Sequence, residues 1–133
     1  MGTHPNLQAL DSALDQAQAQ NVREFLSYFR RLHPQDRLPG RDAFDPVELP
    51  RLLPDIVLAK VVPSPEPGAP PRFLVKVAGD TILKSVDRPI IGRHLDEFVT
   101  EEDPSARFPI ADRLQVVETG RLIFWRGKPR LRF

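Results

Sequence analysis

Residues 38–54 read LPGRDAFDPVELPRLLP, and the apolar run IVLAKVV follows at residues 56–62. Prolines fix φ and remove a backbone donor, so the first stretch predicts a rigid, irregular segment. Short helical turns are expected to begin at Asp45-Pro46 and at Pro50, because proline suits the first helical position. The β-branched content of residues 56–62 predicts a strand. We therefore expect an adaptor segment that leads into the first strand of a small sheet.

The rest of the chain predicts a second strand and then a series of helices. Residues 72–78 (RFLVKVA) have strand composition, and the proline-rich residues 63–71 form a connecting hairpin loop. Short helices are expected between residues 80 and 99, followed by a longer helix that ends at Gly120. Further strands are expected at residues 122–125 and 131–133. This order predicts an α+β domain with an antiparallel sheet.

The N-terminal residues predict helical structure with a change in the apolar periodicity part-way along. Apolar residues recur every three or four positions, and the phase slips by one residue near residue 20. Asn21 and Glu24 resemble a capping box, which favours two helices with a break over a single bent helix. The stripe either packs on its own domain or forms a dimer or partner surface. We divide the chain into an N-terminal helical extension at residues 1–20 and a main domain at residues 21–133. The residues of the predicted helical interface are Leu7, Leu10, Leu14, Ala17, Val22 and Phe25.

Composition excludes several classes of function. The chain has 133 residues, a net charge of +1 and no cysteine. Disulfides, thiolate metal sites and cysteine nucleophiles are therefore excluded. No apolar run approaches the roughly 20 residues of a membrane helix, and no secretory leader is visible. We expect a cytoplasmic protein that does not bind membranes.

Motifs for catalysis and nucleic-acid binding are absent. The serines lie in no nucleophile motif, and the glycines form no phosphate-binding loop. The C-terminal tail mixes basic and aromatic residues, a pattern found in single-strand binders. However, Arg130 and Arg132 alternate with Leu131 and Phe133, which is typical of a half-exposed strand. We expect neither an enzyme nor a nucleic-acid-binding protein.

Three blocks of sequence carry a resemblance to a known family. They are residues 28–29 with 38–39 and 45–54, residues 72–82, and residues 91–97. The chain resembles a family of proteobacterial PAS-like proteins of unassigned function. The PAS fold implies a sheet of about five antiparallel strands, with short helices between the second and third strands. Only 13 residues follow Gly120, enough for about two strands. The last strand is then missing from this chain or supplied by another subunit.

The resemblance implies a ligand pocket between the sheet and the short helices. The alternative is that the same apolar residues fill a packed core without a void. Some PAS domains bind haem through a histidine, for which His94 is the candidate, but we expect His94 at the surface and no cofactor. Two nearby carboxylates of an acidic cluster could hold a divalent ion, but Glu101, Glu102 and Asp103 are placed to favour the N-terminus of the following helix, so no metal site is expected. The cluster consists of Asp96, Glu97, Glu101, Glu102 and Asp103. The predicted pocket lining is Phe73, Val75, Val77, Asp80, Ile82, Val86, Ile91, Phe98, Leu114, Leu122 and Phe124.

These inferences predict a non-catalytic PAS-type sensory or regulatory module in bacterial signalling. It would act through a homodimer or a signalling partner protein, modulated by a small-molecule ligand. The alternatives are a purely structural interaction module without a ligand and a haem-binding sensor.

Overall fold

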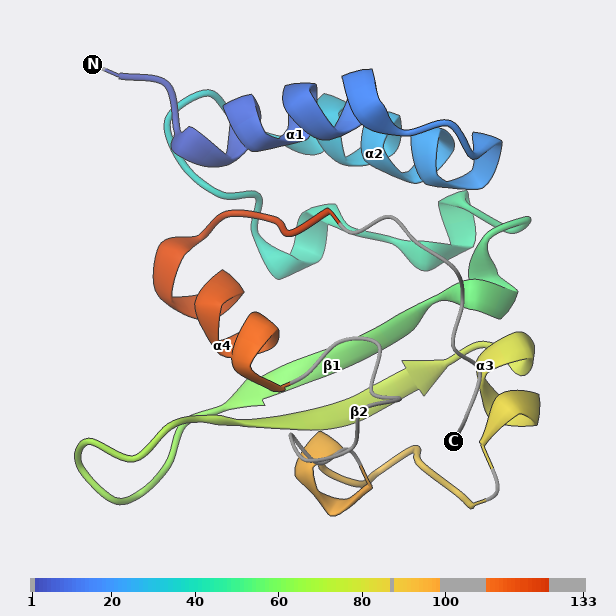
Figure 1. Ribbon diagram of the computed structural model, residues 1–133, viewed down its shortest axis with the longest axis vertical. Helices are drawn as coiled ribbons and strands as arrows, with labels where there is room; N and C mark the ends of the chain where they lie inside the picture. The colour runs from blue at the N-terminus through green and yellow to red at the C-terminus, as the bar shows by residue number, and fades with distance from the viewer. Residues whose placement is uncertain (1, 87, 99–109, 125–133) are drawn as a thin grey trace. The chain divides into compact units, whose positions relative to one another are not determined.

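The computed structural model describes residues 2–86, 88–98 and 110–124 (Figure 1). The chain forms two compact units. The first, which we call the helical unit, runs to Leu52 and resumes at Val116. The second, the sheet unit, runs from Leu53 to Gln115. The division predicted from the sequence, after residue 20, falls inside the helical unit, at the first residue of its second helix.

Two helices form the N-terminal part of the helical unit, α1 (Pro5–Gln16) and α2 (Gln20–Leu32). The predicted break near residue 20 is confirmed. His4 caps α1, because its ring Nδ1 accepts a hydrogen bond from the Asn6 amide at 3.1 Å, and Pro5 occupies the first helical position. The predicted capping box is wrong. α2 already begins at Gln20, so Asn21 lies inside it, and the N-cap residue Ala19 makes no side-chain hydrogen bond.

The apolar stripe of α1 packs inside the helical unit. Leu10 is 1% exposed, and Leu7 is also buried. Across the interface, Leu26 of α2 is buried and Phe29 is half-buried against the same cluster. The Arg23 guanidinium donates to the carbonyl oxygens of Leu14 and Ala17, at 2.7 and 3.0 Å, and so satisfies carbonyls that the end of α1 leaves without helical partners. α1 and α2 therefore form a helical hairpin with its own core (Figure 1).

The proline-rich segment consists of short 3-10 turns. η1 spans Arg41–Ala43, η2 spans Pro46–Glu48 and η3 spans Leu53–Asp55. Asp45 caps η2 by accepting the Val47 amide at 3.0 Å, as the sequence predicts. A hydrogen-bonded turn also begins at Pro50, as predicted: the Leu52 amide donates to the Leu49 carbonyl at 3.0 Å, and η3 follows directly. Tyr28 anchors the segment within the helical unit, because its hydroxyl oxygen accepts a hydrogen bond from the Asp45 amide at 3.2 Å.

The sheet unit is built on an antiparallel pair of strands, β1 (Val57–Val62) and β2 (Arg72–Ala78). Both predicted strands are confirmed to within one residue. Val61 pairs with Phe73 and Ala59 with Val75, and the register shifts between Leu58 and Ala59. The second edge of β2 bonds to a later turn: the Val75 amide donates to the Arg93 carbonyl, and the Gly92 amide donates to the Val75 carbonyl, both at 2.9 Å. Val75 is fully buried and lies at the centre of this unit.

Three helical elements follow the strands in the described residues. They are α3 (Asp80–Ser85), η4 (Leu95–Glu97) and α4 (Ile110–Thr119). The boundary between the two units falls within α4. Gly120 follows α4 with a φ of 65°, and its amide donates to the Val116 carbonyl at 2.8 Å, which confirms the predicted glycine after the helix end.

The predicted α+β class is confirmed, since helices accompany an antiparallel sheet. The described residues hold a two-stranded sheet and not the five strands of a PAS domain. Residues 121–124 belong to no strand, which corrects the strand predicted at 122–125. The Leu122 amide instead donates to Asn6 Oδ1 of α1 at 2.6 Å. Trp125 and the strand predicted at 131–133 lie outside the described residues. None of the described helices is both long and apolar enough to cross a bilayer.

Candidate functional site

Six of the predicted lining residues come together in the sheet unit. Phe73 and Val75 are buried, and the others pack against them as partly buried side chains in a cluster with Ile90 and Leu95. These side chains contact one another, as expected for a packed core. The partly buried four are Ile82, Val86, Phe98 and Leu114.

Three other predicted lining residues are exposed. Ile91 is 52% exposed, because the chain turns at Gly92 (φ 84°) and Ile90, at 3%, takes the buried position. Val77 is 39% exposed and lies beyond the register shift, at the end of the strand pair. Asp80 is exposed in the first turn of α3.

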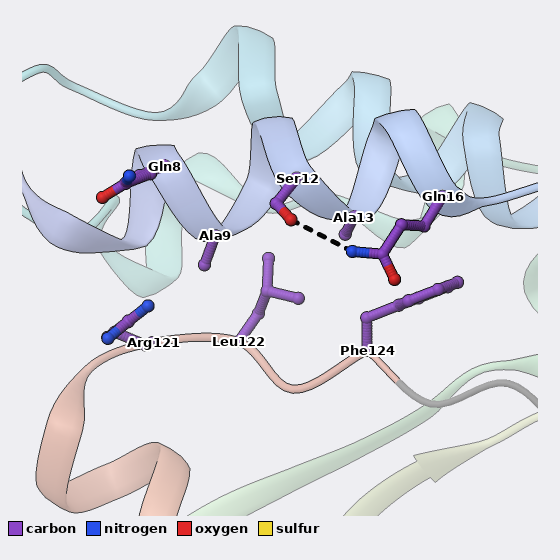
Figure 2. A pocket seen from close by; sticks show the side chains of 8 residues that line it. All are labelled: Gln8, Ala9, Ser12, Ala13, Gln16, Arg121, Leu122 and Phe124. Carbon is purple, nitrogen blue, oxygen red and sulfur yellow. Dashed lines mark hydrogen bonds between the residues drawn. The ribbon is translucent and has the colours of Figure 1, made fainter.

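The last two predicted residues, Leu122 and Phe124, lie in the helical unit. They pack against the α1 core and line a pocket between α1 and residues 121–124 (Figure 2). The predicted set is thus divided between the two units. The pocket between α1 and residues 121–124 has a volume of about 330 Å³, which lies at the lower end of the range for small-molecule sites.

The α1 side of the pocket follows from helical spacing. Gln8, Ser12 and Gln16 are four residues apart and therefore share a face, while Ala9 and Ala13 provide short side chains beside them. The Gln16 Nε2 amide donates to Ser12 Oγ at 3.1 Å. The short side chains of Ala9 and Ala13 leave space beside the helix for the pocket. The polar residues supply hydrogen-bond donors and acceptors at the border of the pocket.

The opposite side is held in place by a buried amide. Asn6 is 6% exposed, and its Oδ1 accepts the Leu122 amide, which ties residues 121–124 to α1. Figure 2 shows Gln8 and Arg121 at one end of the pocket, Gln16 and Phe124 at the other, and Leu122 between them. The pocket therefore has one end with a cation and one end with an aromatic ring.

Most of this lining was missed from the sequence. Polar residues at i, i+4 and i+8 are the ordinary pattern of a solvent-facing helix surface, and Arg121 appeared only as part of a basic tail. The sequence signal that could have indicated a pocket was the pair of small residues, Ala9 and Ala13, beside that polar stripe. On its own, this signal does not show which segment lies opposite.

A second group of charged side chains joins β2 to η4. The Arg72 guanidinium makes two hydrogen bonds to the Asp96 carboxylate, at 2.8 and 2.9 Å. Glu97 accepts the His94 amide at 2.6 Å in a capping box, and the His94 ring is half-buried. Within the ranges that the structure describes, no group of three His, Cys, Asp or Glu side chains could hold a metal ion. The group fastens η4 to the sheet.

The ion pair between Arg72 and Asp96 predicts that the stability of the fold depends on pH. The hydrogen bond from Arg72 holds the pKa of Asp96 below its ordinary value of 3.8. Because the pKa is lower in the folded state, the carboxylate stabilises the fold above about pH 4, and this contribution is lost as the pH falls through the lowered pKa. Asp96→Asn should therefore lower the urea midpoint slightly at pH 7, and its difference from the wild type should become smaller as the pH is lowered from 7 to 2.

The control for this measurement is Asp36→Asn, which removes a longer and more exposed ion pair to Arg37 at 3.4 Å. It should leave the urea midpoint unchanged at both pH values. A midpoint difference for Asp96→Asn that is the same at pH 2 as at pH 7 would contradict the assigned role of its charge.

Comparisons with protein-family models, curated proteins and solved structures give no match to this chain.

Proposed function

We propose that this chain is a non-catalytic PAS-type sensory or regulatory module of bacterial signalling. It binds a small ligand and acts through a protein partner or a second copy of itself. The observation that carries the proposal is the pocket between α1 and residues 121–124. The order β1, β2, α3, η4 and α4 is also consistent with the first part of a PAS domain.

The chemistry of the pocket favours binding over catalysis. Its described lining consists of amide, hydroxyl, guanidinium and apolar side chains, without histidine, carboxylate, lysine or cysteine. General acid–base catalysis uses a group that titrates near the operating pH, and none of these side chains does so. The same side chains are suited to hydrogen bonding and stacking.

The position of the pocket suggests how binding could be transmitted. Residues 121–124 continue directly from α4 through Gly120, and the Asn6–Leu122 hydrogen bond fixes them on α1. A ligand that contacts both sides stabilises the docked arrangement of this segment over any undocked one. Such differential affinity is what a ligand needs in order to shift a conformational equilibrium.

Native mass spectrometry of freshly purified protein tests the proposal, with Ser12→Met as the pocket-filling variant. We expect a small additional mass on the wild-type chain that is lost in Ser12→Met, because the longer side chain occupies the pocket. Ser27→Met is the matched control, since Ser27 is also an exposed helical serine of the helical unit and lies outside the lining. Wild-type protein without added mass, or added mass that survives in Ser12→Met, would contradict the proposal.

A purely structural interaction module is the second candidate. Within the described part of the chain, the outer edge of β1 has no strand partner, and Val57 and Val61 are each 41% exposed. Unpaired edges of this kind recruit strands from other chains. A dimer without added mass in the same spectra would favour this candidate over the ligand-binding module.

A further inference from the structure

Among the residues that the structure describes, the lining of the pocket between α1 and residues 121–124 carries one positive charge and no negative charge. Arg121 is exposed, and no described carboxylate lies within ion-pair distance of its guanidinium. The other polar residues of the lining, Gln8, Ser12 and Gln16, are neutral. A guanidinium that forms no ion pair with the described carboxylates and lies at the end of a pocket is available to an anionic group, and its planar donors match a carboxylate with two hydrogen bonds.

The neutral neighbours indicate which anion fits. A phosphate dianion is ordinarily held by several positive groups or by a series of backbone amides, and the described part of this lining provides a single cation. A carboxylate carries one negative charge, which one guanidinium compensates. The Gln8 amide, at the same end of the pocket (Figure 2), can donate a further hydrogen bond to a carboxylate oxygen.

The other end of the pocket selects an apolar group. Phe124 lies there and Leu122 lies between the two ends (Figure 2), and both side chains are half-buried against the α1 core. An apolar or aromatic group bound beside Phe124 removes further apolar surface from water. The volume of about 330 Å³ limits the ligand to a small metabolite.

We propose that the pocket binds a small monocarboxylic acid with an apolar tail, with the carboxylate on Arg121 and the tail against Phe124. This inference rests on the proposed function of the pocket as a ligand site. It assigns Arg121 as the residue that distinguishes an acid from its neutral analogue.

The test compares 4-phenylbutyrate with the neutral 4-phenylbutanamide, titrated into the full chain and followed by backbone-amide NMR. We expect the acid to give saturable shifts at Ser12, Gln16, Arg121 and Leu122 and to bind more tightly than the amide. Arg121→Gln should weaken binding of the acid about five- to tenfold, the lower part of the range for a charge-assisted hydrogen bond because Arg121 is exposed. Binding of the amide should stay unchanged in this variant.

Arg37→Gln is the matched control, because Arg37 is an exposed arginine of the same unit outside the lining. It should bind the acid as tightly as the wild type does. An equal loss of affinity in Arg37→Gln, equal affinity for acid and amide, or the absence of saturable shifts with the acid would each overturn the inference. A retained mass in the native spectra together with any of these results would leave the ligand site standing and refute only the carboxylate assignment.

Discussion

Replacing Gly79 with alanine is expected to destabilise the sheet unit by about 3 kcal/mol, the upper end of the usual cost of overpacking. Gly79 joins β2 to α3, and its amide donates to the Ile56 carbonyl at 2.9 Å. A Cβ at this position would overlap the carbonyl oxygen of Leu53 and the carbonyl group of Pro54. These atoms belong to the backbone, so they cannot move aside by a change of rotamer. The junction between η3, β1 and α3 would have to open.

A second glycine separates this steric effect from the general consequences of replacing glycine. Gly40 has φ −70° and ψ 161°, almost the same as Gly79 with −73° and 164°, and both residues are N-caps. A Cβ at Gly40 meets no atom within 4 Å. Gly40→Ala should therefore change stability by less than about 1 kcal/mol, since only backbone entropy and the cap preference are altered.

The measurement is urea unfolding followed by circular dichroism, with amide hydrogen exchange at Val75 and Gly92 to report on the sheet unit. Exchange at these two amides should become faster in Gly79→Ala and stay unchanged in Gly40→Ala. An unchanged urea midpoint in Gly79→Ala would show that the junction accommodates a methyl group, and the close approach would then have no role in stability.

Local patterns in the sequence predicted the elements of the fold well. The strand at residues 72–78 follows from its β-branched content, and the turn at Asp45-Pro46 follows from two residues with defined roles at a helix start. The choice between Ile90 and Ile91 was not decidable from composition, because either isoleucine could be the buried one. The positive φ of Gly92 sets which of them faces the core.

The candidate site was harder to predict because its two sides are far apart in sequence. Residues 122–124 have the composition of a strand, and nothing local shows that the Leu122 amide binds the side chain of Asn6, 116 residues earlier. The same separation in sequence prevents prediction of the pocket. Gln8 and Ser12 are ordinary surface residues until Leu122 and Phe124 are placed opposite them. Tertiary contact, and not propensity, makes this location a site.

The second large effect is expected for Leu10→Ala, which should lower the stability of the helical unit by about 3 kcal/mol. Leu10 is 1% exposed and lies in the core with Leu7, Ala13 and Leu26. Truncation of a fully buried leucine removes apolar contacts and leaves a cavity, with a usual cost of about 2–5 kcal/mol. Leu38→Ala is the control, because Leu38 is 43% exposed and should cost less than about 1 kcal/mol.

The concentration dependence of this effect distinguishes the two interpretations of the α1 stripe. A stripe that formed a dimer surface would give a stability that rises with protein concentration, since association is linked to folding by mass action. In the structure Leu7, Leu10 and Ala17 are buried in the chain's own helical unit, so a second copy could reach them only if that unit opened. We therefore expect the urea midpoints of the wild type and of Leu10→Ala to differ by the same amount over a hundredfold range of concentration. A difference that changes with concentration would assign the stripe to a dimer surface, and the core described for the helical unit would then form only on association.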